Sequence, residues 1–313
     1  MKLRWGFLGA SWVATTAMAP AVHASKFAVL QSVASRDLNR AAALAPVTAY
    51  GSYLDLLADP NVDAVYISLA NHLHYEWSIK ALQAGKHVLC EKPLALNRAQ
   101  AQAMFDCAKA NDRMLVEAIW FRWHPRFRRV VEIVKNGDLG ELLSIDSAFT
   151  FSQSFIGNYR LSPQMGGGSL MDVAPYQLHT WVALSDAAAK FEIISVTKDM
   201  GPTGVDLSTA IDAVIDKHLA VRAVTSFKEK EEQRLIITGQ LGEIEFPDNQ
   251  AFTSWNSASS LLIGDFEEVF APVDSFLLMI ESFAARLRGD EYWLPDVNDS
   301  LRVMEMIDQV NKF

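Results

Sequence analysis

The sequence predicts an α/β protein: an N-terminal Rossmann doubly wound parallel sheet, followed by a C-terminal α+β domain with a large open, mostly antiparallel sheet. Strand-like and helix-like segments alternate up to about residue 119, strand-like segments then follow one another, and two helical segments close the chain. At 313 residues the chain is long for one compact unit. We therefore predict a dinucleotide-binding domain over 1–119 and a substrate-binding and oligomerisation domain over 120–313, with the last helices free to pack back on the first domain.

The first half shows the rhythm of βαβ units. LRWGFLGA is a short apolar strand, and FAVLQSVAS is the second strand. Asp37 is placed to cap the helix DLNRAAALA that follows. The remaining predicted segments are a short helix SYLDLLADP, a third strand VDAVYISLA, a helix HYEWSIKALQAG ending at Gly85, a strand HVLCEK, a helix over 97–111 and a strand RMLVEAIW.

The second half reads as a sheet with one covered face. Leu219, Val221 and Ala223 alternate with the polar His218 and Arg222, which is typical of an antiparallel strand. The predicted strands are LLSIDSAFTF, FEIISVTKDM, TAIDAVID, LAVRAVTSF, EQRLIITGQ and GEIEFP, and two helices follow around 274–288 and 297–311.

Charge and cysteine content exclude several classes of protein. Lys and Arg number 28 against 37 Asp and Glu, a net charge of −9, which argues against a nucleic-acid or anionic-membrane surface. The two cysteines, Cys90 and Cys107, form no CxxC pair, so we expect a reduced compartment and no structural zinc. The first 25 residues resemble a secretory signal, but Gly6 and Gly9 interrupt their apolar middle. We predict a soluble, cytoplasmic protein with neither nucleic acid nor membrane as a partner.

A small-residue turn follows the first strand and opens a helix. Residues 9–14 fit the pattern G-x-G-x-x-A if Ser11 replaces the second glycine. Small residues let backbone N–H groups approach a pyrophosphate at the helix N-terminus. Taken alone the match is weak, because about half of such matches are ordinary βα turns. Its place at the first strand favours cofactor binding by Gly9, Ala10, Ser11, Trp12 and Val13.

The end of the second strand indicates which dinucleotide is bound. NAD-binding folds usually place a carboxylate there for the ribose 2′-hydroxyl, whereas here Ser35 and Arg36 hold that place. A hydroxyl and a guanidinium suit a 2′-phosphate. Asp37 is the counter-argument, but helix capping explains it. We predict NADP(H) in preference to NAD(H).

Four stretches together resemble the glucose–fructose oxidoreductase, inositol dehydrogenase and rhizopine catabolism (Gfo/Idh/MocA) family. They are WGFLGAS, NHLHYEWSIKALQAGKHVLCEKPLA, EAIWFRWHP and NYRLSPQMGGGSLMD. The glycine turn is common, whereas AGKHVLCEKP with a downstream GGGxLxD is specific. WGFLGAS and EAIWFR look most like the NADP-linked sugar-ketone reductases and the dihydrodiol and xylose dehydrogenases. The resemblance implies a C-terminal sheet whose outer face mediates a homo-oligomer, a dimer or a tetramer.

The resemblance also implies site residues. It places Lys92 beside the nicotinamide and on the substrate oxygen, with Glu91 and Pro93 shaping its turn. Further implied contacts are Leu69, Asn71 and His74 near the cofactor, Tyr159 and Arg160 as an aromatic–arginine pair reaching cofactor or substrate, and Trp120 as a wall of the substrate pocket. The family often has histidine as proton donor after GGG, in D-x-G-x-H. Here Tyr176 holds that position, as in other members, and the preceding Ala174 and Pro175 are less usual.

The residues around Tyr176 suggest a catalytic constellation. Asp172, Tyr176 and His179 are spaced i, i+4, i+7, so a helix places them on one face. Because proline is tolerated only in a first helical turn, we expect the helix to start near Ala174, with Asp172 just before it. A free tyrosine has a pKa of about 10, so Lys92 is expected to polarise the substrate oxygen and to lower that pKa. Asp172 would orient the substrate hydroxyls.

Two groups of residues have competing interpretations. His179 is either a substrate or proton-relay residue or a buried core histidine. WFRWHPRFRR suggests a nucleic-acid patch, but Phe127, Val130, Val131 and Val134 form a core stripe, which would leave the arginines on its solvated side. The histidines at 72, 74 and 87 lack the spacing of a metal site, so we predict no metal.

We therefore expect an NADP(H)-dependent oxidoreductase that transfers hydride to or from the C–OH/C=O carbon of a sugar, a sugar derivative or a vicinal diol. Two alternatives stay open. One is a glycoside hydrolase of the same fold that holds NAD and acts by transient oxidation. The other is a non-catalytic, NADP-binding sensor. The sequence does not identify the substrate.

Overall fold

The computed structural model describes residues 2–313. The chain forms two compact units, Met1–Trp120 with Asp274–Ser300, and Phe121–Val273 with Leu301–Phe313. Within residues 2–313, none of the helices has both the length and the apolar character that crossing a bilayer demands.

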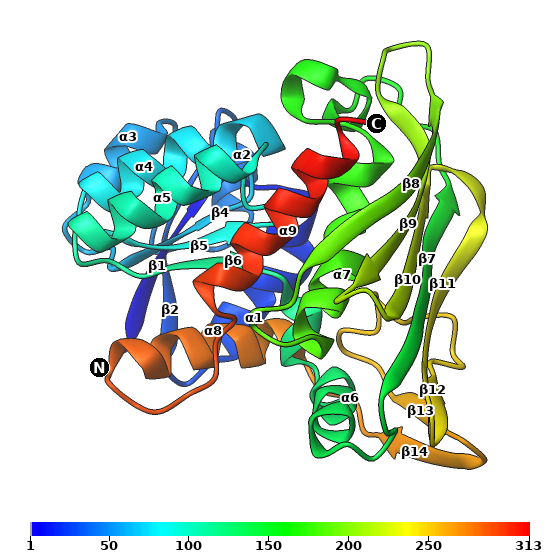
Figure 1. Cartoon of the computed structure of the whole chain (residues 1–313). Helices are drawn as coiled ribbons and strands as arrows, with labels where there is room; N and C mark the ends of the chain where they lie inside the picture. Colours follow the sequence, from blue (N-terminus) through cyan, green and yellow to red (C-terminus); the bar gives the residue numbers. More distant parts are fainter. Residues whose placement is uncertain (1) are drawn as a thin grey trace. The chain divides into compact units, whose positions relative to one another are not determined.

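The first unit contains a parallel sheet of six strands in the order β3-β2-β1-β4-β5-β6 (Figure 1). This is the strand order of a Rossmann sheet. From β1 the chain adds β2 and β3 on one side and then β4, β5 and β6 on the other, so the strand order reverses between β1 and β4. The predicted doubly wound sheet is confirmed. The strands are β1 (Leu3–Leu8), β2 (Ala28–Ala34), β3 (Thr48–Tyr50), β4 (Ala64–Ile67), β5 (His87–Glu91) and β6 (Leu115–Ala118).

Helices connect these strands, and local sequence explains several of their ends. Asp37 caps α2 as predicted, because its carboxylate accepts the backbone N–H groups of Asn39 and Arg40. The half-buried strand β3 was not predicted, because its three residues show no apolar alternation. The helices are η1 (Ala14–Met18), α1 (Ala19–Ala24), α2 (Leu38–Ala42), α3 (Tyr53–Ala58), η2 (Asn71–Leu73), α4 (His74–Gln83), α5 (Arg98–Ala110) and α8 (Ser275–Leu287).

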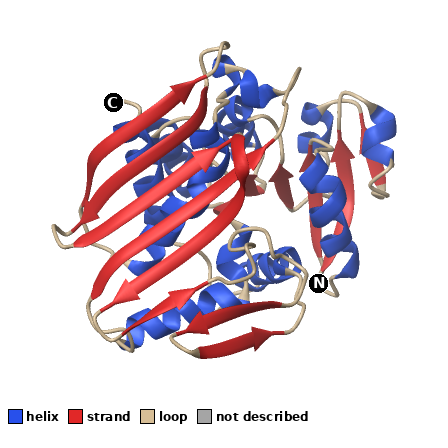
Figure 2. Cartoon of the chain, turned by 90° about the vertical axis from the view of Figure 1, so that its right-hand side faces the viewer, coloured by secondary structure: helices blue, strands red, loops and turns tan. Residues whose placement is uncertain are grey.

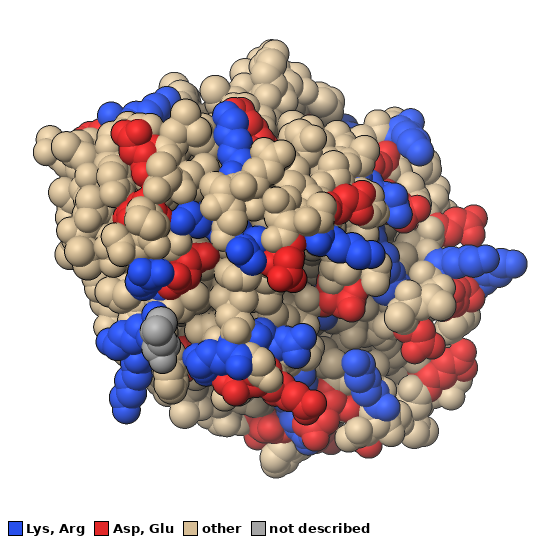
Figure 3. Space-filling view, turned by 90° about the vertical axis from the view of Figure 1, so that its left-hand side faces the viewer, with Lys and Arg blue, Asp and Glu red and all other residues tan. Residues whose placement is uncertain are grey.

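Helix α8 belongs to the first unit although it lies far along the chain. Its Phe283 ring packs against Trp5 of β1, with ring centroids 5.0 Å apart, and both side chains are fully buried. Figure 3 shows one face on which acidic and basic side chains are interspersed.

The second unit contains an eight-stranded sheet in the order β14-β13-β12-β11-β7-β10-β9-β8, in which only β7 and β10 pair in parallel (Figure 2). The predicted large, mostly antiparallel sheet is confirmed. Its strands are β7 (Leu142–Ser152), β8 (Phe191–Met200), β9 (Asp206–Ile215), β10 (Leu219–Ser226), β11 (Lys228–Gly239), β12 (Gly242–Glu245), β13 (Ser259–Ile263) and β14 (Phe266–Phe270). The hairpin of β13 and β14 was missed, because Phe266 and Val269 of its edge strand are exposed and show no core pattern.

One face of this sheet is covered by α7 (Ser169–Leu184), every residue of which is buried. On β10, Leu219, Val221 and Ala223 are buried and Arg222 is exposed, as their alternation predicted. The other helices are η3 (Trp120–Trp123), α6 (Pro125–Asn136), η4 (Tyr159–Leu161), η5 (Pro163–Met165) and α9 (Val297–Val310). The chain passes between the two units within η3, just before α8 and within α9.

The predicted start of α7 was wrong. The helix begins at Ser169, so Asp172 lies in its first turn and Pro175 lies inside it. The cause is a cap from another element: Asp206 of β9 accepts the Leu170 N–H at 2.8 Å and the Ser169 hydroxyl at 2.7 Å. This carboxylate satisfies the early helical donors, so the helix extends upstream of the proline.

The prediction that the arginines of this segment face solvent was wrong for Arg122 and Arg126, which are buried, whereas Arg128 and Arg129 are half-exposed. Phe127, Val130 and Val131 are buried as expected, and Val134 is half-buried, but Arg126 is only 2% exposed. Its guanidinium donates to Asp248 at 2.6 Å and to the Gln250 carbonyl at 2.8 Å. A buried guanidinium needs such partners, and they come from a loop more than a hundred residues away.

Candidate functional site

The predicted cofactor residues of the first unit follow the carboxyl ends of its strands. The glycine turn follows β1, Ser35 and Arg36 follow β2, Leu69 and Asn71 follow β4, and Lys92 follows β5. Because parallel strands end at one edge, the fold brings these segments to a single edge of the sheet. In doubly wound folds, ligands bind at this edge where the strand order reverses, here between β1 and β4.

The turn after β1 requires a glycine at its first position. Gly9 has φ of +100°, and a Cβ there would lie 2.9 Å from a Leu69 methyl carbon and 3.1 Å from the Ser68 carbonyl oxygen. Ser11, which replaces the second glycine, accepts the Ala14 N–H on its hydroxyl at 3.1 Å. The helix therefore starts with a capped turn, and Trp12 is 75% exposed beside it.

The end of β2 presents two guanidinium groups, one of which sequence reasoning missed. Arg36 is exposed there, and Arg40 of α2 donates to the carbonyl of Ala10 in the glycine turn. Burial raises the pKa of the Tyr53 hydroxyl, and both guanidiniums oppose that rise, which places their charges near it. The available sequence sign was that Arg40 lies in the helical segment that directly follows Arg36.

The carboxylate of Asp37 is occupied by its two capping bonds to the α2 backbone. The Ser35 hydroxyl accepts the Asp37 N–H at 3.2 Å, so the two side chains fix the strand–helix corner. Both observations agree with the expectation that Asp37 serves the helix.

Lys92 is partly exposed and follows a buried glutamate. The Glu91 carboxylate accepts the Tyr66 hydroxyl at 2.6 Å and the Lys92 backbone N–H at 3.3 Å. Burial raises the pKa of Glu91, while the Tyr66 hydrogen bond and the nearby Lys92 charge oppose that rise. Glu91 is 8% exposed, so its visible role is to shape the turn.

His74 is fully buried, and both ring nitrogens face backbone carbonyls. Nδ1 lies 2.8 Å from the Pro93 oxygen and Nε2 lies 3.0 Å from the Leu69 oxygen. Desolvation lowers the pKa of His74, although these hydrogen bonds oppose the change. His74 can therefore affect a bound cofactor only by holding the backbone at Pro93 and Leu69 in place. Asn71, in the same loop, is also buried.

In the second unit, Arg160 and Asp172 form a short ion pair. The Arg160 Nε donates to Asp172 Oδ2 at 2.7 Å, and the Asp172 side chain is 8% exposed. Burial lowers the pKa of Arg160, but Asp172 and the hydroxyls of Tyr159 and Tyr176 more than offset this and raise it overall. The guanidinium therefore keeps its charge close to both tyrosines.

The glycine run before α7 allows close packing around this pair. A Cβ on Gly167 would lie 2.4 Å from the Arg160 carbonyl oxygen, and one on Gly168, whose φ is +110°, would lie 2.0 Å from an Asp206 carboxylate oxygen. Only residues without a side chain fit both positions. The run thus links the Arg160 loop to the start of α7.

Asp172, Tyr176 and His179 lie on one helix, as their spacing predicted. Tyr176 is 9% exposed and packs among Phe121, Phe149 and Phe252. His179 is fully buried. Its role in a substrate site stays a prediction.

Trp120 lies at the end of the first unit and is 6% exposed. Its ring stacks on Phe276 of α8, with centroids 5.4 Å apart. Its predicted role as a substrate wall stays a prediction. Among residues 2–313, no three His, Cys, Asp or Glu side chains gather in an arrangement suited to a metal ion.

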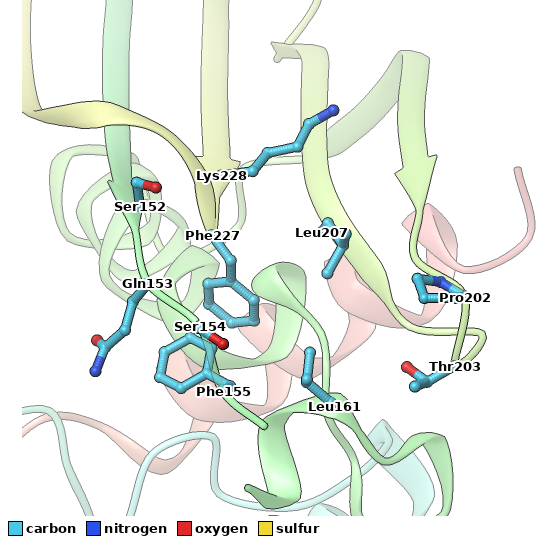
Figure 4. Close-up of a pocket in the computed structure, with 10 residues that line it drawn as sticks. All are labelled: Ser152, Gln153, Ser154, Phe155, Leu161, Pro202, Thr203, Leu207, Phe227 and Lys228. Atoms are coloured by element: carbon cyan, nitrogen blue, oxygen red, sulfur yellow. The ribbon is translucent and has the colours of Figure 1, made fainter. Parts of the chain in front are cut away.

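A pocket of about 320 Å³ lies in the second unit beside the Arg160 loop. Its walls include Phe155, Phe227 and Leu161, and Leu161 directly follows Arg160 in the chain. Figure 4 shows that the Lys228 amine extends away from these side chains. The remaining lining residues are Ser152, Gln153, Ser154, Pro202, Thr203 and Leu207.

Comparisons with known proteins cover nearly the whole chain. Residues 3–118 match a family model described as an oxidoreductase family with an NAD-binding Rossmann fold, and residues 127–245 match a GFO/IDH/MocA C-terminal domain. D-xylose 1-dehydrogenase (NADP(+)) 2 of Haloferax volcanii is 34% identical over 98% of this chain and 96% of its own length. A dTDP-3,4-didehydro-2,6-dideoxy-alpha-D-glucose 3-reductase of Actinomadura kijaniata is 29% identical over 98% and 94%.

Solved structures share this architecture. The 3-ketoreductase KijD10 of Actinomadura kijaniata, crystallised with NADP and TDP-benzene, superimposes with a TM-score of 0.91. It is 27% identical, and the match covers 100% of this chain and 98% of that one.

Proposed function

Because this chain belongs to the Gfo/Idh/MocA oxidoreductase family, we propose that it transfers hydride between NADP(H) and the C–OH/C=O carbon of a sugar, a sugar derivative or a vicinal diol. The observation that carries the proposal is the Lys92 turn, which lies at the same edge of the Rossmann sheet as the glycine turn. A cation at that edge can polarise a carbonyl oxygen next to a dinucleotide.

The residues at this edge fit a dinucleotide with a 2′-phosphate. Gly9 leaves room for a close approach of the backbone, Arg36 and Arg40 supply positive charge, and the Asp37 carboxylate is engaged in capping α2. A relative named as NADP(+)-dependent and a structural neighbour crystallised with NADP support the same choice. When bound, the cofactor supplies the hydride at C4 of its nicotinamide ring.

The chain's own groups supply the proton and the charge stabilisation. In the direction of reduction, the Lys92 ammonium donates a hydrogen bond to the carbonyl oxygen, and Tyr176 gives its hydroxyl proton to that oxygen as the carbon receives hydride. Arg160 holds its charge near the Tyr176 hydroxyl and stabilises the resulting phenolate. Asp172 fixes Arg160 and orients substrate hydroxyls.

The carbohydrate nature of the substrate rests on relatives and on the pocket next to Arg160. One relative is named for xylose and another for a dTDP-linked keto sugar. The pocket is lined by Phe155 and Phe227, and the Arg160 guanidinium lies 5.3 Å from the centroid of the Phe155 ring, so apolar surface and a charged group lie close together, which suits a ring with one apolar and one hydroxylated face.

A substrate screen tests the proposal. Aldoses, keto sugars and trans-diols are incubated with each of NADP(H) and NAD(H), and nicotinamide absorbance is followed. We expect turnover with at least one carbonyl or hydroxyl sugar, faster with NADP(H). Release of free sugar from an aryl glycoside, without net change in absorbance, would instead support the hydrolase alternative.

Lys92→Met provides the matching test of the catalytic group. We expect loss of measurable turnover with NADPH affinity within about 3-fold of wild type, because the lysine acts on the substrate oxygen and methionine preserves its bulk. NADPH affinity is measured by fluorescence titration. Lys80→Met, which removes a half-exposed lysine on α4 that pairs with Glu76, is the control and should leave the rate unchanged. Retained turnover in Lys92→Met would reject the role given to Lys92.

A further inference from the structure

The turn that follows β5 contains Lys92, Pro93 and Leu94. In each of these three residues a backbone polar group lies within hydrogen-bond distance of a buried side chain. The Lys92 N–H donates to Glu91 at 3.3 Å, the Pro93 carbonyl oxygen lies 2.8 Å from His74 Nδ1, and the Leu94 N–H donates to Glu117 at 3.0 Å. The three holding side chains come from β5, α4 and β6, so they approach the turn from separate elements.

Glu117 is the unexpected member of this group. It lies within β6, where its neighbours Leu115, Val116 and Ala118 are apolar, and it is 2% exposed. A buried carboxylate in an apolar strand is costly unless it has partners, and it was assigned no role from the sequence. Its charge is felt by both His74 and Glu91, which places the three side chains in one cluster.

We propose that Glu117 is a positioning residue for Lys92, acting by accepting the Leu94 N–H and thereby fixing the turn that presents the lysine. The inference rests on the proposed function of Lys92. Glu91 is the residue directly before Lys92, so its hydrogen bond fixes only the amino end of the turn. Glu117 and His74 fix the residues that follow, so that the backbone on both sides of Lys92 is held.

The geometry explains why hydrogen-bond acceptance, and not bulk, is the function of Glu117. Leu94 and Ala95 are fully buried, so the Leu94 N–H has no access to solvent when Glu117 is removed. An unsatisfied buried donor favours rearrangement of the turn toward another acceptor. A shift of about 1 Å in a catalytic group lowers the rate by about 100-fold.

Two variants separate the acceptor from the bulk. Glu117→Gln retains a carbonyl acceptor, whereas Glu117→Met has similar length and no comparable acceptor. We expect Glu117→Met to lower kcat by about 10- to 100-fold with KM for NADPH within about 3-fold, and Glu117→Gln to stay within about 3-fold of wild type in both. If Glu117→Met does not fold, Glu117→Asp, which withdraws the acceptor by one methylene, should show an intermediate loss of kcat.

Hydrogen exchange of the apoprotein gives a readout that needs no activity. Amide exchange in the peptide covering residues 92–97 should accelerate at least about 10-fold in Glu117→Met and remain near wild type in Glu117→Gln. Asp59→Ala is the matched control, since Asp59 is a buried carboxylate that accepts from Ser32 and the Asn61 N–H before β4. It should lower stability without changing kcat or exchange in that peptide.

The outcomes distinguish the inference from the proposed function. Wild-type kcat and exchange in Glu117→Met would overturn the positioning role, as would equal damage from Glu117→Gln and Glu117→Met. Retained turnover in Lys92→Met would overturn the role of Lys92 itself, while the exchange experiment would still report whether Glu117 holds the turn.

Discussion

At the scale of single residues, Tyr176 combines a buried ring with a hydroxyl that we propose as the proton donor. Its ring packs among three phenylalanines, so its position is fixed by contacts that do not involve the hydroxyl. Arg160 supplies a positive charge near that hydroxyl from within the same unit. Sequence reasoning assigned this electrostatic role to Lys92, and that assignment stays a prediction; Arg160 is a cation that sequence reasoning did not consider for this role.

Tyr176→Phe should therefore remove the proton donor while leaving the packing intact. We expect kcat to fall by about 100- to 10,000-fold, the usual share of general acid–base catalysis, with an unfolding midpoint within a few degrees of wild type. Steady-state kinetics and thermal unfolding check both parts. An unchanged kcat would transfer the proton-donor role to His179 or to water.

The two guanidiniums at the end of β2 predict the cofactor preference. Arg36→Ala and Arg40→Ala should each weaken NADPH by about 10- to 100-fold, because a hydrogen bond to a charged phosphate contributes about 1.5–3 kcal/mol. NADH affinity should change by less than about 3-fold, since NADH lacks the 2′-phosphate. Arg113→Ala, which removes a guanidinium bonded to the Gly85 carbonyl, is the control for net charge. Equal losses for NADPH and NADH would contradict the NADP(H) assignment.

At the scale of elements, α7 depends on a cap supplied by a strand. Asp206 accepts from the Leu170 N–H and from the hydroxyls of Ser169 and Thr209. We expect Asp206→Ala to lower the free energy of unfolding by about 2–4 kcal/mol, because it leaves several buried donors without an acceptor. Denaturant unfolding measures this loss.

Asp199→Ala is the matched control for that experiment. Asp199 is exposed at the end of β8 and pairs with Lys228 at the surface. Its removal should change the free energy of unfolding by less than about 0.5–1 kcal/mol. Similar losses for Asp199→Ala and Asp206→Ala would contradict the role of Asp206 as the helix cap.

The start of α6 predicts a pH dependence of stability. The ring of His124 accepts the Arg126 N–H at 3.0 Å, and desolvation together with the Arg126 charge lowers the pKa of His124 to about 4. The unfolded chain, with a histidine pKa of about 6.5, binds the proton first. The stabilisation is therefore complete above pH 6.5 and is lost as pH falls toward 4, by on the order of 3 kcal/mol.

His124→Asn checks this dependence, because asparagine retains a capping oxygen and does not titrate. At pH 7 the wild type should be the more stable protein. As the pH falls to 4, this difference in unfolding free energy should shrink or change sign. A difference that is constant with pH would show that His124 does not titrate differently on unfolding.

At the scale of the whole molecule, Lys92 and Tyr176 belong to different units. If both act on one substrate oxygen, their effects on catalysis should not add. We expect Lys92→Met/Tyr176→Phe to be no slower than Lys92→Met alone, because removal of either group disables the same step. Because Lys92→Met is expected to lack measurable steady-state turnover, the coupling is measured in single turnovers with saturating NADPH and with enzyme in excess over substrate, where far slower rates are detectable. Fully additive losses would show that the two residues serve separate steps.

The sequence by itself determined the family, the Rossmann sheet, the large antiparallel sheet and the placement of Asp37 as a cap. These features depend on local periodicity, on turn residues and on motifs, all of which are contiguous in the chain. The alternation of Leu219, Val221 and Ala223 was sufficient to predict one covered face, because every second residue of a strand points the same way.

Tertiary structure alone decided where the buried polar groups find their partners. Asp206 extends α7 beyond the start that Pro175 predicted, Asp248 holds Arg126 inside the protein, and Glu117 reaches the amide of Leu94. Each of these partners lies more than twenty residues away along the chain. A buried polar group needs a hydrogen-bond partner, but the fold determines which distant group provides it. The local sequence pattern therefore does not predict that partner.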